Sequence, residues 1–572
     1  MVSTLSERWL VGARDTQAEQ TLREQLGVST LTALLLAQRG YTDLATAQEF
    51  LNPSLANLHN PELLPDFEAA AAEILGAIGR KELIYVHGDY DVDGVTSAAI
   101  ITRFLRAVGG NVVVHVPHRL REGYGIHPSA VDSAHEQGAK LFLTCDCGIV
   151  AHDQIQRALD YGMRVVVTDH HEPNETLPPA HAVVNPHRAD SEYPFTELSG
   201  AGVAFKLCAG LTVKMGLPLE GYYRAYADLA TLGTVADVMP LLGENRILVS
   251  YGLTQLRCTK KVGLVALMNG ALKNGAGPVR SSDISFRLAP RLNAAGRLDD
   301  AAISLDLLLE TDSRKAEQLA LRLEELNQER QSEQRLLIES AVAHVVESGL
   351  HENPVILVTG ENWHHGIIGL VAGKLTERFG RPTLVVTLEP ETGVGKGSAR
   401  SIPGFHLAEA FHRLAPLVKG GGHELAAGFS IQMQDLDAFH AALLDYAANL
   451  EGFEPGLRPV ELTAEISAAE GDLTAVEEMS IMEPFGAANP EPVFCTRNLR
   501  VESVQELSRG EHRKFQFRSE EGLLRTALLW GCGSDLDHIV AGSQVHAAYT
   551  IGMDTFQGSK TLRWTIRDLC PA

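Results

Sequence analysis

Cysteine, long apolar runs and excess positive charge are all scarce in this sequence. It has seven Cys among 572 residues, an odd and scattered set that does not form the framework of a disulfide-stabilised domain. Cys145 and Cys147 flank Asp146, which differs from the C-x-x-C spacing of redox and zinc sites. We therefore expect buried thiols in a reducing, cytoplasmic compartment.

Long apolar segments of the kind that span a membrane are also missing from the sequence. No apolar run approaches the ~20 residues that a bilayer-spanning helix needs, and the start, MVSTLSERWLVGARD, has no apolar segment of the kind found in signal peptides. We expect no membrane partner. Lys and Arg number 49 against 72 Asp and Glu, which gives a net charge of −23. Taken alone, this balance argues against nucleic acid bound through bulk positive charge.

Short β-branched runs that alternate with helical patterns dominate the first half of the chain. We expect strands at 83–86, 112–116, 141–144, 164–168 and 182–185, a pattern typical of βαβ units with a parallel sheet. Ligands of such sheets bind beyond the carboxyl ends of the strands. Polar residues follow three of these strands: His87, Asp89, Asp91 and Asp93, then Asp146, then Asp169, His170 and His171.

These clusters, together with Asp237 at the end of a helical segment, predict a metal site. Oxygen and imidazole ligands without thiolates favour Mn²⁺ or Mg²⁺ over structural zinc, and the number of carboxylates suggests two ions about 3.5–4 Å apart. A single Asp after a strand is more often a helix cap or turn residue. The joint occurrence at successive strand ends favours the metal.

The remaining pattern predicts five segments. We expect an N-terminal helical segment (1–60), an α/β catalytic domain (61–300), a long and mostly polar linking helix (301–350), a second α/β domain (351–450) and a C-terminal domain of short strands (451–572). The predicted fold class is α/β, with two α/β lobes joined by the long helix around a cleft. The short strands of the last segment predict a small C-terminal β-barrel.

The motifs resemble a known family. HGDYDVDG, TCDCG, TDHH and GTVADV, in that order, resemble the DHH phosphoesterase superfamily, and WHHGIIGLVAGKL, GKGSARSIPGFHL and GGHELAAGFS resemble its DHHA1 domain. APRLNAAGRL, the long helix and the β tail extend the likeness, over about 45–570, to single-strand-specific 5′→3′ DNA exonucleases. The resemblance implies release of 5′-mononucleotides from single-stranded DNA with a free 5′ end, in recombination and in DNA repair, including mismatch repair.

The resemblance also implies roles for individual residues. One Mn²⁺ or Mg²⁺ would be held by His87, Asp91 and Asp146, and a second by Asp93, Asp146, His170 and Asp237. Asp89 and Asp169 would orient these ligands. The groups acting at the reacting phosphate would be His171, Asp146, Asp169 and Arg400. The 5′ phosphate and the DNA backbone would be bound by Arg119, Arg297, Ser398, Arg400 and His423.

Some alternatives stay open at this point. The DHH motifs are shared with small-nucleotide and pyrophosphate phosphohydrolases, and a non-catalytic replication scaffold is a second alternative. We expect a monomer, with a single-strand-binding protein and a helicase as protein partners. Two positions depart from the family pattern: His365, where Pro, Glu or Gln is common, and Gly420, where an aromatic residue is common.

Positive charge is local rather than general. Residues 497–518 hold six Lys and Arg against three Glu. With the resemblance, this basic track suggests that the C-terminal barrel is an OB-like domain that binds nucleic acid. Four aromatic residues of this domain could stack bases or fill its core, and for most of them we expect filling: Phe515, Phe517, Trp530 and Trp564.

Overall fold

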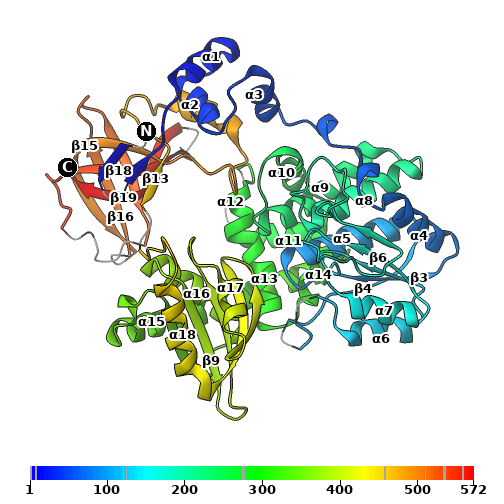
Figure 1. Cartoon of the computed structure of the whole chain (residues 1–572). Coiled ribbons are helices and arrows are strands. Elements are labelled where there is room, and N and C mark those ends of the chain that lie inside the picture. Colours follow the sequence, from blue (N-terminus) through cyan, green and yellow to red (C-terminus); the bar gives the residue numbers. More distant parts are fainter. Residues whose placement is uncertain are drawn as a thin grey trace. The chain divides into compact units, whose positions relative to one another are not determined.

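The computed structural model in Figure 1 describes residues 3–6, 9–119, 121–123, 125–272, 277–456, 459–508, 511–531, 536, 538–556 and 559–572. The chain divides into two compact units. The lobed unit comprises His59–Met239 and Tyr251–Leu457, and the barrel unit comprises Met1–Leu58, Pro240–Ser250 and Arg458–Ala572. No helix among the described residues is long and apolar enough to cross a membrane.

The first lobe of the lobed unit contains a five-stranded parallel sheet, as the sequence predicts. Its order is β4-β3-β5-β6-β7. The bounds are β3 Leu83–His87, β4 Asn111–His115, β5 Leu141–Thr144, β6 Arg164–Thr168 and β7 Ala182–Val184. β3, β5 and β6 are almost entirely buried, because helices cover both faces of a parallel sheet.

Six helices pack around this sheet. Their bounds are α4 Phe67–Gly79, α5 Val92–Ala107, α6 Pro128–Glu136, α7 His152–Asp160, α8 Gly200–Lys214 and α9 Leu219–Ala236. α6 and α7 cover one face of the sheet, and α4, α5 and α8 lie on the other (Figure 1). α5, α8 and α9 pack on one another, so the first turn of α5 and the end of α9 meet near the carboxyl ends of the strands.

A group of helices follows, and α10 (Gly243–Arg257) belongs partly to each unit. The others are α11 Val262–Ala271, α12 Ser281–Asp283, the π-helical turn η3 Ile284–Leu288, α13 Ala289–Leu298, α14 Ala302–Leu309 and α15 Ser313–Glu347. The predicted linking helix is therefore two helices. The chain is extended at Glu310, and Asp312 caps α15 by accepting a hydrogen bond from the Lys315 amide at 3.0 Å.

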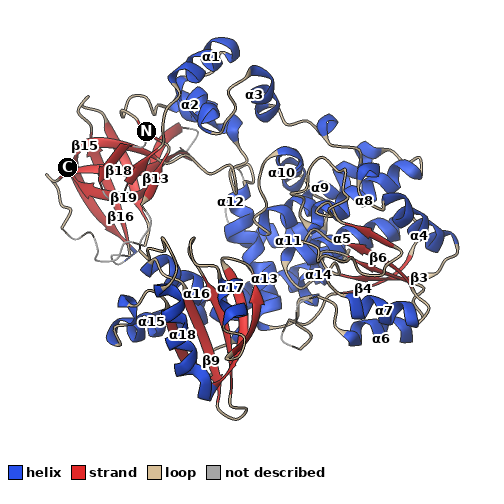
Figure 2. Ribbon diagram, in the orientation of Figure 1, coloured by secondary structure: helices blue, strands red, loops and turns tan. Residues whose placement is uncertain are grey.

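The second lobe is a five-stranded mixed sheet of order β11-β12-β10-β9-β8. Its strands are β8 Ile356–Glu361, β9 Thr383–Glu389, β10 Val394–Arg400, β11 Val418–Gly422 and β12 Ala426–Gln432. Its helices are α16 His365–Phe379, α17 Leu407–Arg413 and α18 Leu436–Ala448. The Gly-rich segment at 394–400 is thus a strand, and the segment around His423 is a β-hairpin turn. Figure 2 shows α16, α17 and α18 together with β9 of this sheet.

The two departures from the family pattern lie in this lobe. The His365 Nε2 and Glu389 Oε1 atoms are 2.9 Å apart, so this contact holds His365 at the N-terminus of α16. A Cβ on Gly420 would lie 2.7 Å from the Phe429 Cβ and 2.8 Å from the Phe411 Cδ2. An aromatic side chain at position 420 would therefore require Phe429 and the ring of Phe411 to shift.

The barrel unit is built on a closed, mostly antiparallel sheet, which confirms the predicted C-terminal barrel. Its order is β14-β15-β16-β17-β19-β18, and β15 also pairs with β18. The strands are β14 Ala464–Glu465, β15 Phe494–Leu507, β16 His512–Arg518, β17 Leu524–Leu529, β18 Gln544–Phe556 and β19 Ser559–Pro571.

N-terminal residues complete the barrel unit. β1 (Ser3–Ser6), β2 (Trp9–Val11) and β13 (Val460–Leu462) form a small sheet in which β13 runs parallel to β2. Four helices accompany it: α1 Thr16–Leu26, α2 Thr30–Gln38, α3 Leu44–Leu51 and α19 Leu473–Met479. Leu34 and Phe50 share one buried core with Phe515 and Trp564, so the first 58 residues and the barrel fold as one body.

Candidate metal centre

The site begins at the turn between β3 and α5. β3 ends at His87, and Asp91 caps α5 by accepting a hydrogen bond from the Gly94 amide at 3.0 Å. A Cβ on Gly94 would lie 2.6 Å from the backbone of Asp89. The turn therefore packs so closely on the first turn of α5 that only glycine fits there, and this packing fixes Asp91 and Asp93 beside the strand end.

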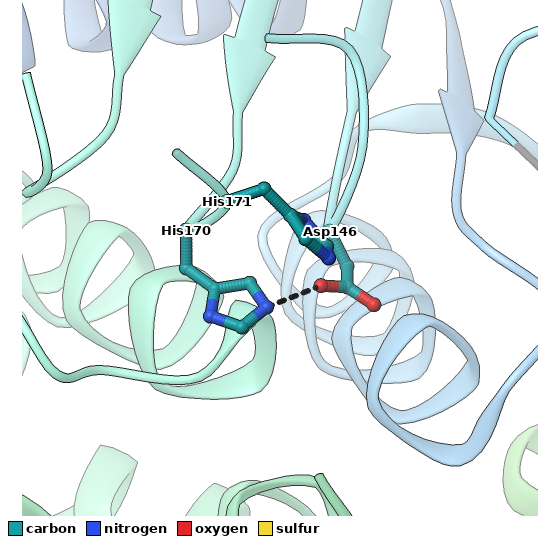
Figure 3. A group of neighbouring side chains, drawn as sticks. All are labelled: Asp146, His170 and His171. Carbon is teal, nitrogen blue, oxygen red and sulfur yellow. Dashed lines mark ion pairs between the residues drawn. The ribbon is translucent and has the colours of Figure 1, made fainter. Parts of the chain in front are cut away.

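Three predicted carboxylate ligands meet around the imidazole of a fourth, His170. The His170 Nε2 atom lies 3.1 Å from Asp146 Oδ1, 3.7 Å from Asp237 Oδ2 and 3.8 Å from Asp93 Oδ2. Figure 3 shows the ring of His170 directed at the Asp146 carboxylate. These side chains come from the ends of β5, β6 and α9 and from the first turn of α5. Two overlapping groups, Asp93–His170–Asp237 and Asp146–His170–His171, each present three ligand atoms within 4.8 Å of one another.

Burial perturbs the carboxylates of this cluster. Burial and the Asp91 charge raise the pKa of Asp93 to about 7 and that of Asp89 to about 8. Burial and the Asp93 charge raise the pKa of Asp237 to about 8 and hold the pKa of Asp146 well above its usual value. Close carboxylates raise one another's pKa in this way when no cation offsets them. The cluster therefore fits a divalent cation.

Two of the three histidines of the site, His87 and His170, are suited to metal as well. Burial lowers the pKa of His87 to about 3 and that of His170 to about 4, so both rings are neutral at physiological pH. The His87 Nε2 atom faces the Gly125 carbonyl oxygen at 3.3 Å. Its Nδ1 atom is buried and has no hydrogen-bond partner among the described residues. A proton on Nε2 leaves the Nδ1 lone pair available to a metal. Neither group of three ligand atoms includes His87 or Asp91.

Asp169 does not face the ligand groups but holds the two neighbouring histidines, His170 and His171, in place. Its Oδ1 accepts hydrogen bonds from the His170 amide at 2.8 Å and from His171 Nδ1 at 2.8 Å, and its Oδ2 accepts one from the Ile149 amide at 2.9 Å. Burial opposes ionisation, but the His171 hydrogen bond and charge keep the pKa of Asp169 below its usual value. Burial likewise opposes the charge on His171, yet Asp169 raises the pKa of His171 to about 9. His171 is therefore a cation beside the carboxylates.

Sequence reasoning missed the residues that hold this histidine pair. Asn185 Nδ2 donates to the His171 carbonyl oxygen at 2.8 Å, and the ring of His187 lies with Nδ1 2.6 Å from the His170 carbonyl oxygen. The Gly200 and Ala201 amides, at the start of α8, donate to the Asp93 carboxylate at 2.6 and 2.9 Å. The only sequence signal was a further polar group, N-P-H, directly after β7.

Guanidinium groups from both lobes form a second cluster in the lobed unit. Burial and the charges of Arg119, Arg330 and Arg400 lower the pKa of Arg297 to about 10, and burial with Arg119 lowers the pKa of Arg400. Arg400 Nη1 donates to Ser398 Oγ at 3.3 Å, Arg297 Nη1 donates to the Gly366 carbonyl oxygen at 3.0 Å, and Arg119 lies over the Tyr90 ring. None of these arginines pairs with a carboxylate in the part of the chain described. Such a cluster favours an anion.

Other predicted binding residues are not brought to this cluster. His423 is exposed in the β11–β12 turn, and among the described residues no hydrogen bond or ion pair joins its side chain to the arginines. On the barrel, Arg497 pairs with Glu465, Arg518 pairs with Glu502, and Arg513 is buried, so the basic track is smaller than the sequence suggested. Arg509 lies outside the described residues.

The barrel aromatics mostly fill the core, as expected. Three of the four are fully buried, namely Phe515, Phe517 and Trp564. Trp564 stacks on Tyr549 with a ring separation of 3.7 Å. Trp530 is the exception because 54% of its surface is exposed.

Three family models match this chain, and each covers one of the domains described above. Residues 83–234 match the DHH family, N-terminal domain, residues 352–449 match the DHHA1 domain, and residues 462–568 match the RecJ OB domain. The single-stranded-DNA-specific exonuclease RecJ of Bacillus subtilis is 35% identical over 98% of this chain and 70% of its own length. RecJ of Dickeya dadantii is 36% identical over 97% of this chain and 98% of its own length.

Two crystal structures also match this chain. The crystal structure of Thermus thermophilus RecJ in complex with Mn²⁺ covers 99% of this chain and 80% of its own, with a TM-score of 0.84 and 33% identity. The complex of the same protein with Mg²⁺ matches with a TM-score of 0.77. Both the domain order and nearly the whole length are shared, and the chain belongs to the RecJ family of single-stranded-DNA-specific exonucleases.

Proposed function

We propose that this chain is a metal-dependent exonuclease that degrades single-stranded DNA from a free 5′ end and releases 5′-mononucleotides in DNA recombination and repair. The observation that carries this proposal is the cluster of Asp93, Asp146, His170 and Asp237, in which three carboxylates lie within 3.8 Å of the His170 Nε2 atom. Membership of the RecJ family supports the choice of substrate.

The ligand sets follow the geometry of this cluster. Asp93, Asp146, His170 and Asp237 would hold one Mn²⁺ or Mg²⁺, and Asp146 would be shared with a second ion held by His87 and Asp91. When bound, the divalent ions neutralise phosphate charge and lower the pKa of a water molecule towards neutrality. Asp89 orients these ligands through the turn after β3, and Asp169 orients His170 by accepting a hydrogen bond from its backbone amide.

The chain's own groups position and polarise the phosphate. His171 is protonated at neutral pH, because Asp169 raises its pKa to about 9, and it donates a hydrogen bond to a phosphoryl oxygen on which charge increases. Arg119, Arg297, Ser398 and Arg400 form the anion site that holds the terminal 5′ phosphate. Fixing the end of the strand places the first phosphodiester bond at the metal ligands, which accounts for the direction of degradation.

The test is a comparison of four DNA substrates, 5′- or 3′-labelled and single- or double-stranded, with Mn²⁺ or with chelator. We expect 5′-labelled single strands to yield labelled mononucleotide at once, and chelator to stop the reaction. Asp146→Asn should lower the rate by more than about 10³-fold, whereas Asp153→Asn, an exposed residue of α7, should not change it. Faster hydrolysis of pyrophosphate or of a dinucleotide than of DNA would contradict the proposal.

We further propose that the protein acts as a cytoplasmic monomer, with a single-strand-binding protein and a helicase as partners. We also propose domain limits of 61–300 and 351–450 for the two lobes, with 301–350 as the link and with 1–60 and 451–572 as the flanking parts. Sedimentation of the purified protein at micromolar concentration should give the mass of one chain. A stable dimer would contradict the monomer.

A further inference from the structure

A cavity of about 700 Å³ lies on the lobed unit away from the metal centre. Its lining includes Arg103 of α5, Tyr226 and Asp228 of α9, and Cys258, Lys260 and Lys261 in the segment between α10 and α11. Arg103 comes ten residues after Asp93 in α5, and Tyr226 comes eleven before Asp237. At 1.5 Å per residue, the cavity lies about 15 Å along both helices from the metal ligands.

The acidic groups of the cavity already have protein partners. Asp228 accepts hydrogen bonds from Lys261 Nζ at 2.8 Å and from Thr259 Oγ1 at 2.8 Å. Glu310 Oε1 accepts bonds from the Thr311 and Asp312 amides at 2.7 and 2.8 Å. Both carboxylates are therefore engaged in holding the wall together and offer little to a ligand.

The basic groups are in excess. Arg103 is half-buried, and its Nε donates to the Leu308 carbonyl oxygen at 2.8 Å. In the part of the chain described, neither Arg103 nor the exposed Lys260 pairs with a carboxylate. Arg224 adds a fourth cation to the lining, although it also pairs with Glu220. Lys261 and Arg224 are thus paired, whereas Arg103 and Lys260 are the two cations of the wall that favour an anion.

An aromatic ring completes the wall. The Tyr226 ring packs against Tyr222 in a tilted arrangement with a ring separation of 4.9 Å, and Lys261 Nζ lies 5.9 Å from the centre of the Tyr226 ring. The Tyr226 hydroxyl stays neutral and can donate a hydrogen bond, because burial raises the pKa of Tyr226 to about 12. An aromatic face beside cations suits a ligand with a base and a phosphate, and the volume is in the range of small-molecule sites, about 300–1,000 Å³.

We propose that this cavity is a second, non-catalytic site for a phosphorylated ligand the size of a mononucleotide. The phosphate would contact Arg103 and Lys260, and the base would lie against Tyr226. The site is separate from the metal centre, so the inference stands even if the reaction proposed above is wrong. The chain itself supplies a local probe, because Cys258 is exposed and lines the cavity.

The experiment measures the rate at which N-ethylmaleimide labels Cys258 in chelator-treated full-length protein, by mass spectrometry of the peptide that contains it. We expect dAMP to slow labelling about tenfold, inorganic phosphate to slow it less at equal concentration, and deoxyadenosine to have no effect. Lys260→Glu should abolish the protection by dAMP. The matched control is Lys140→Glu, an exposed lysine outside the lining, which should keep it.

Three results would overturn the proposal. Unchanged labelling with both dAMP and phosphate would exclude the site. Equal protection by phosphate and dAMP would exclude the base from the ligand class, and full protection in Lys260→Glu would exclude the assigned phosphate contact. Arg103→Met provides a second variant for the same comparison, and the ratio of rates with and without dAMP corrects for any change in the reactivity of the thiol itself.

Discussion

The His171 Nδ1 atom lies 2.8 Å from Asp169 Oδ1, and this carboxylate is almost fully buried. The pair keeps an imidazolium beside a cluster of carboxylates, where burial alone would remove its proton. This pairing predicts that His171 contributes to the rate of DNA hydrolysis only while Asp169 keeps it protonated. Asp169 itself does not face the ligand groups.

We expect Asp169→Asn to lower the rate of DNA hydrolysis at pH 8 by about 10²-fold, the cost of losing one donor to a developing charge. Without the carboxylate, burial lowers the pKa of His171, so its ring is neutral at pH 8 and partly charged at pH 6. The loss should therefore be smaller at pH 6, and Mn²⁺ affinity should change little. An equal loss at both pH values would show that Asp169 acts in another way.

The metal-free protein should become less stable as pH rises from 6.5 to 9. In this range Asp89, Asp93, Asp237 and His171 have folded-state pKa values of about 7 to 9, above their ordinary values. The folded chain then holds more protons than the unfolded chain, so the free energy of unfolding falls with pH. His87 and His170 are neutral in the folded chain but half protonated at pH 6.5 in the unfolded chain, so they oppose this trend below about pH 7.5 and add nothing above it.

Thermal unfolding in chelator at pH 6.5 and pH 9 measures this effect, and Mn²⁺ should remove most of it by replacing the protons. Each retained proton changes the free energy of unfolding by up to about 1.4 kcal/mol per pH unit. A melting temperature that stays constant or rises across this range in chelator would contradict the electrostatic account of the cluster.

Gly200 limits the space behind the Asp146 carboxylate. A Cβ at this position would lie 2.4 Å from Asp146 Oδ1, so Gly200→Ala must displace the ligand. We expect Mn²⁺ affinity to fall by about 10–100-fold, as for other residues that position ligands, measured by calorimetry. Gly270→Ala is the control, because a Cβ there meets nothing within 4 Å and should only stabilise α11, by roughly 1 kcal/mol. Unchanged affinity in Gly200→Ala would count against Asp146 as a ligand.

The sequence predicted the elements whose pattern is local. β3, β5 and β6 are short apolar runs that end in polar residues, and the parallel sheet brings those ends to one edge. This is why Asp93, Asp146 and His170 could be grouped before the structure was known. The fully buried Phe515 and Phe517 were predictable for a similar reason, because they alternate with polar residues along a strand.

What the sequence could not show depends on long-range packing. Trp9 Nε1 donates to Asp568 Oδ2 at 2.7 Å, across nearly the whole chain, and no local pattern reveals that the N-terminal segment joins the barrel. The left-handed backbone of Asp146, with φ of 60°, is imposed by the turn that follows β5. Asn185 and His187 act through backbone carbonyl groups, so their residue types alone did not mark them as part of the site.

Val238, directly after Asp237, carries local strain. Its φ is 59°, a conformation that is rare for a β-branched residue and costs about 1–2 kcal/mol, and 70% of its side chain is exposed. Val238→Gly removes this strain but gives the unfolded chain more freedom, so we expect the metal-free protein to gain roughly 0.5–1 kcal/mol in urea unfolding.

The same substitution should weaken Mn²⁺ binding several-fold, because glycine lets the backbone that aims Asp237 relax. Lys81→Gly is the matched control: Lys81 has a φ of 56° in the turn between α4 and β3, away from the ligand groups. It should gain similar stability with unchanged Mn²⁺ affinity. If both variants bind Mn²⁺ as tightly as the unchanged protein, the strain at Val238 has no effect on the metal ligands. If only Val238→Gly binds Mn²⁺ more weakly, the strained backbone at Val238 holds Asp237 in position.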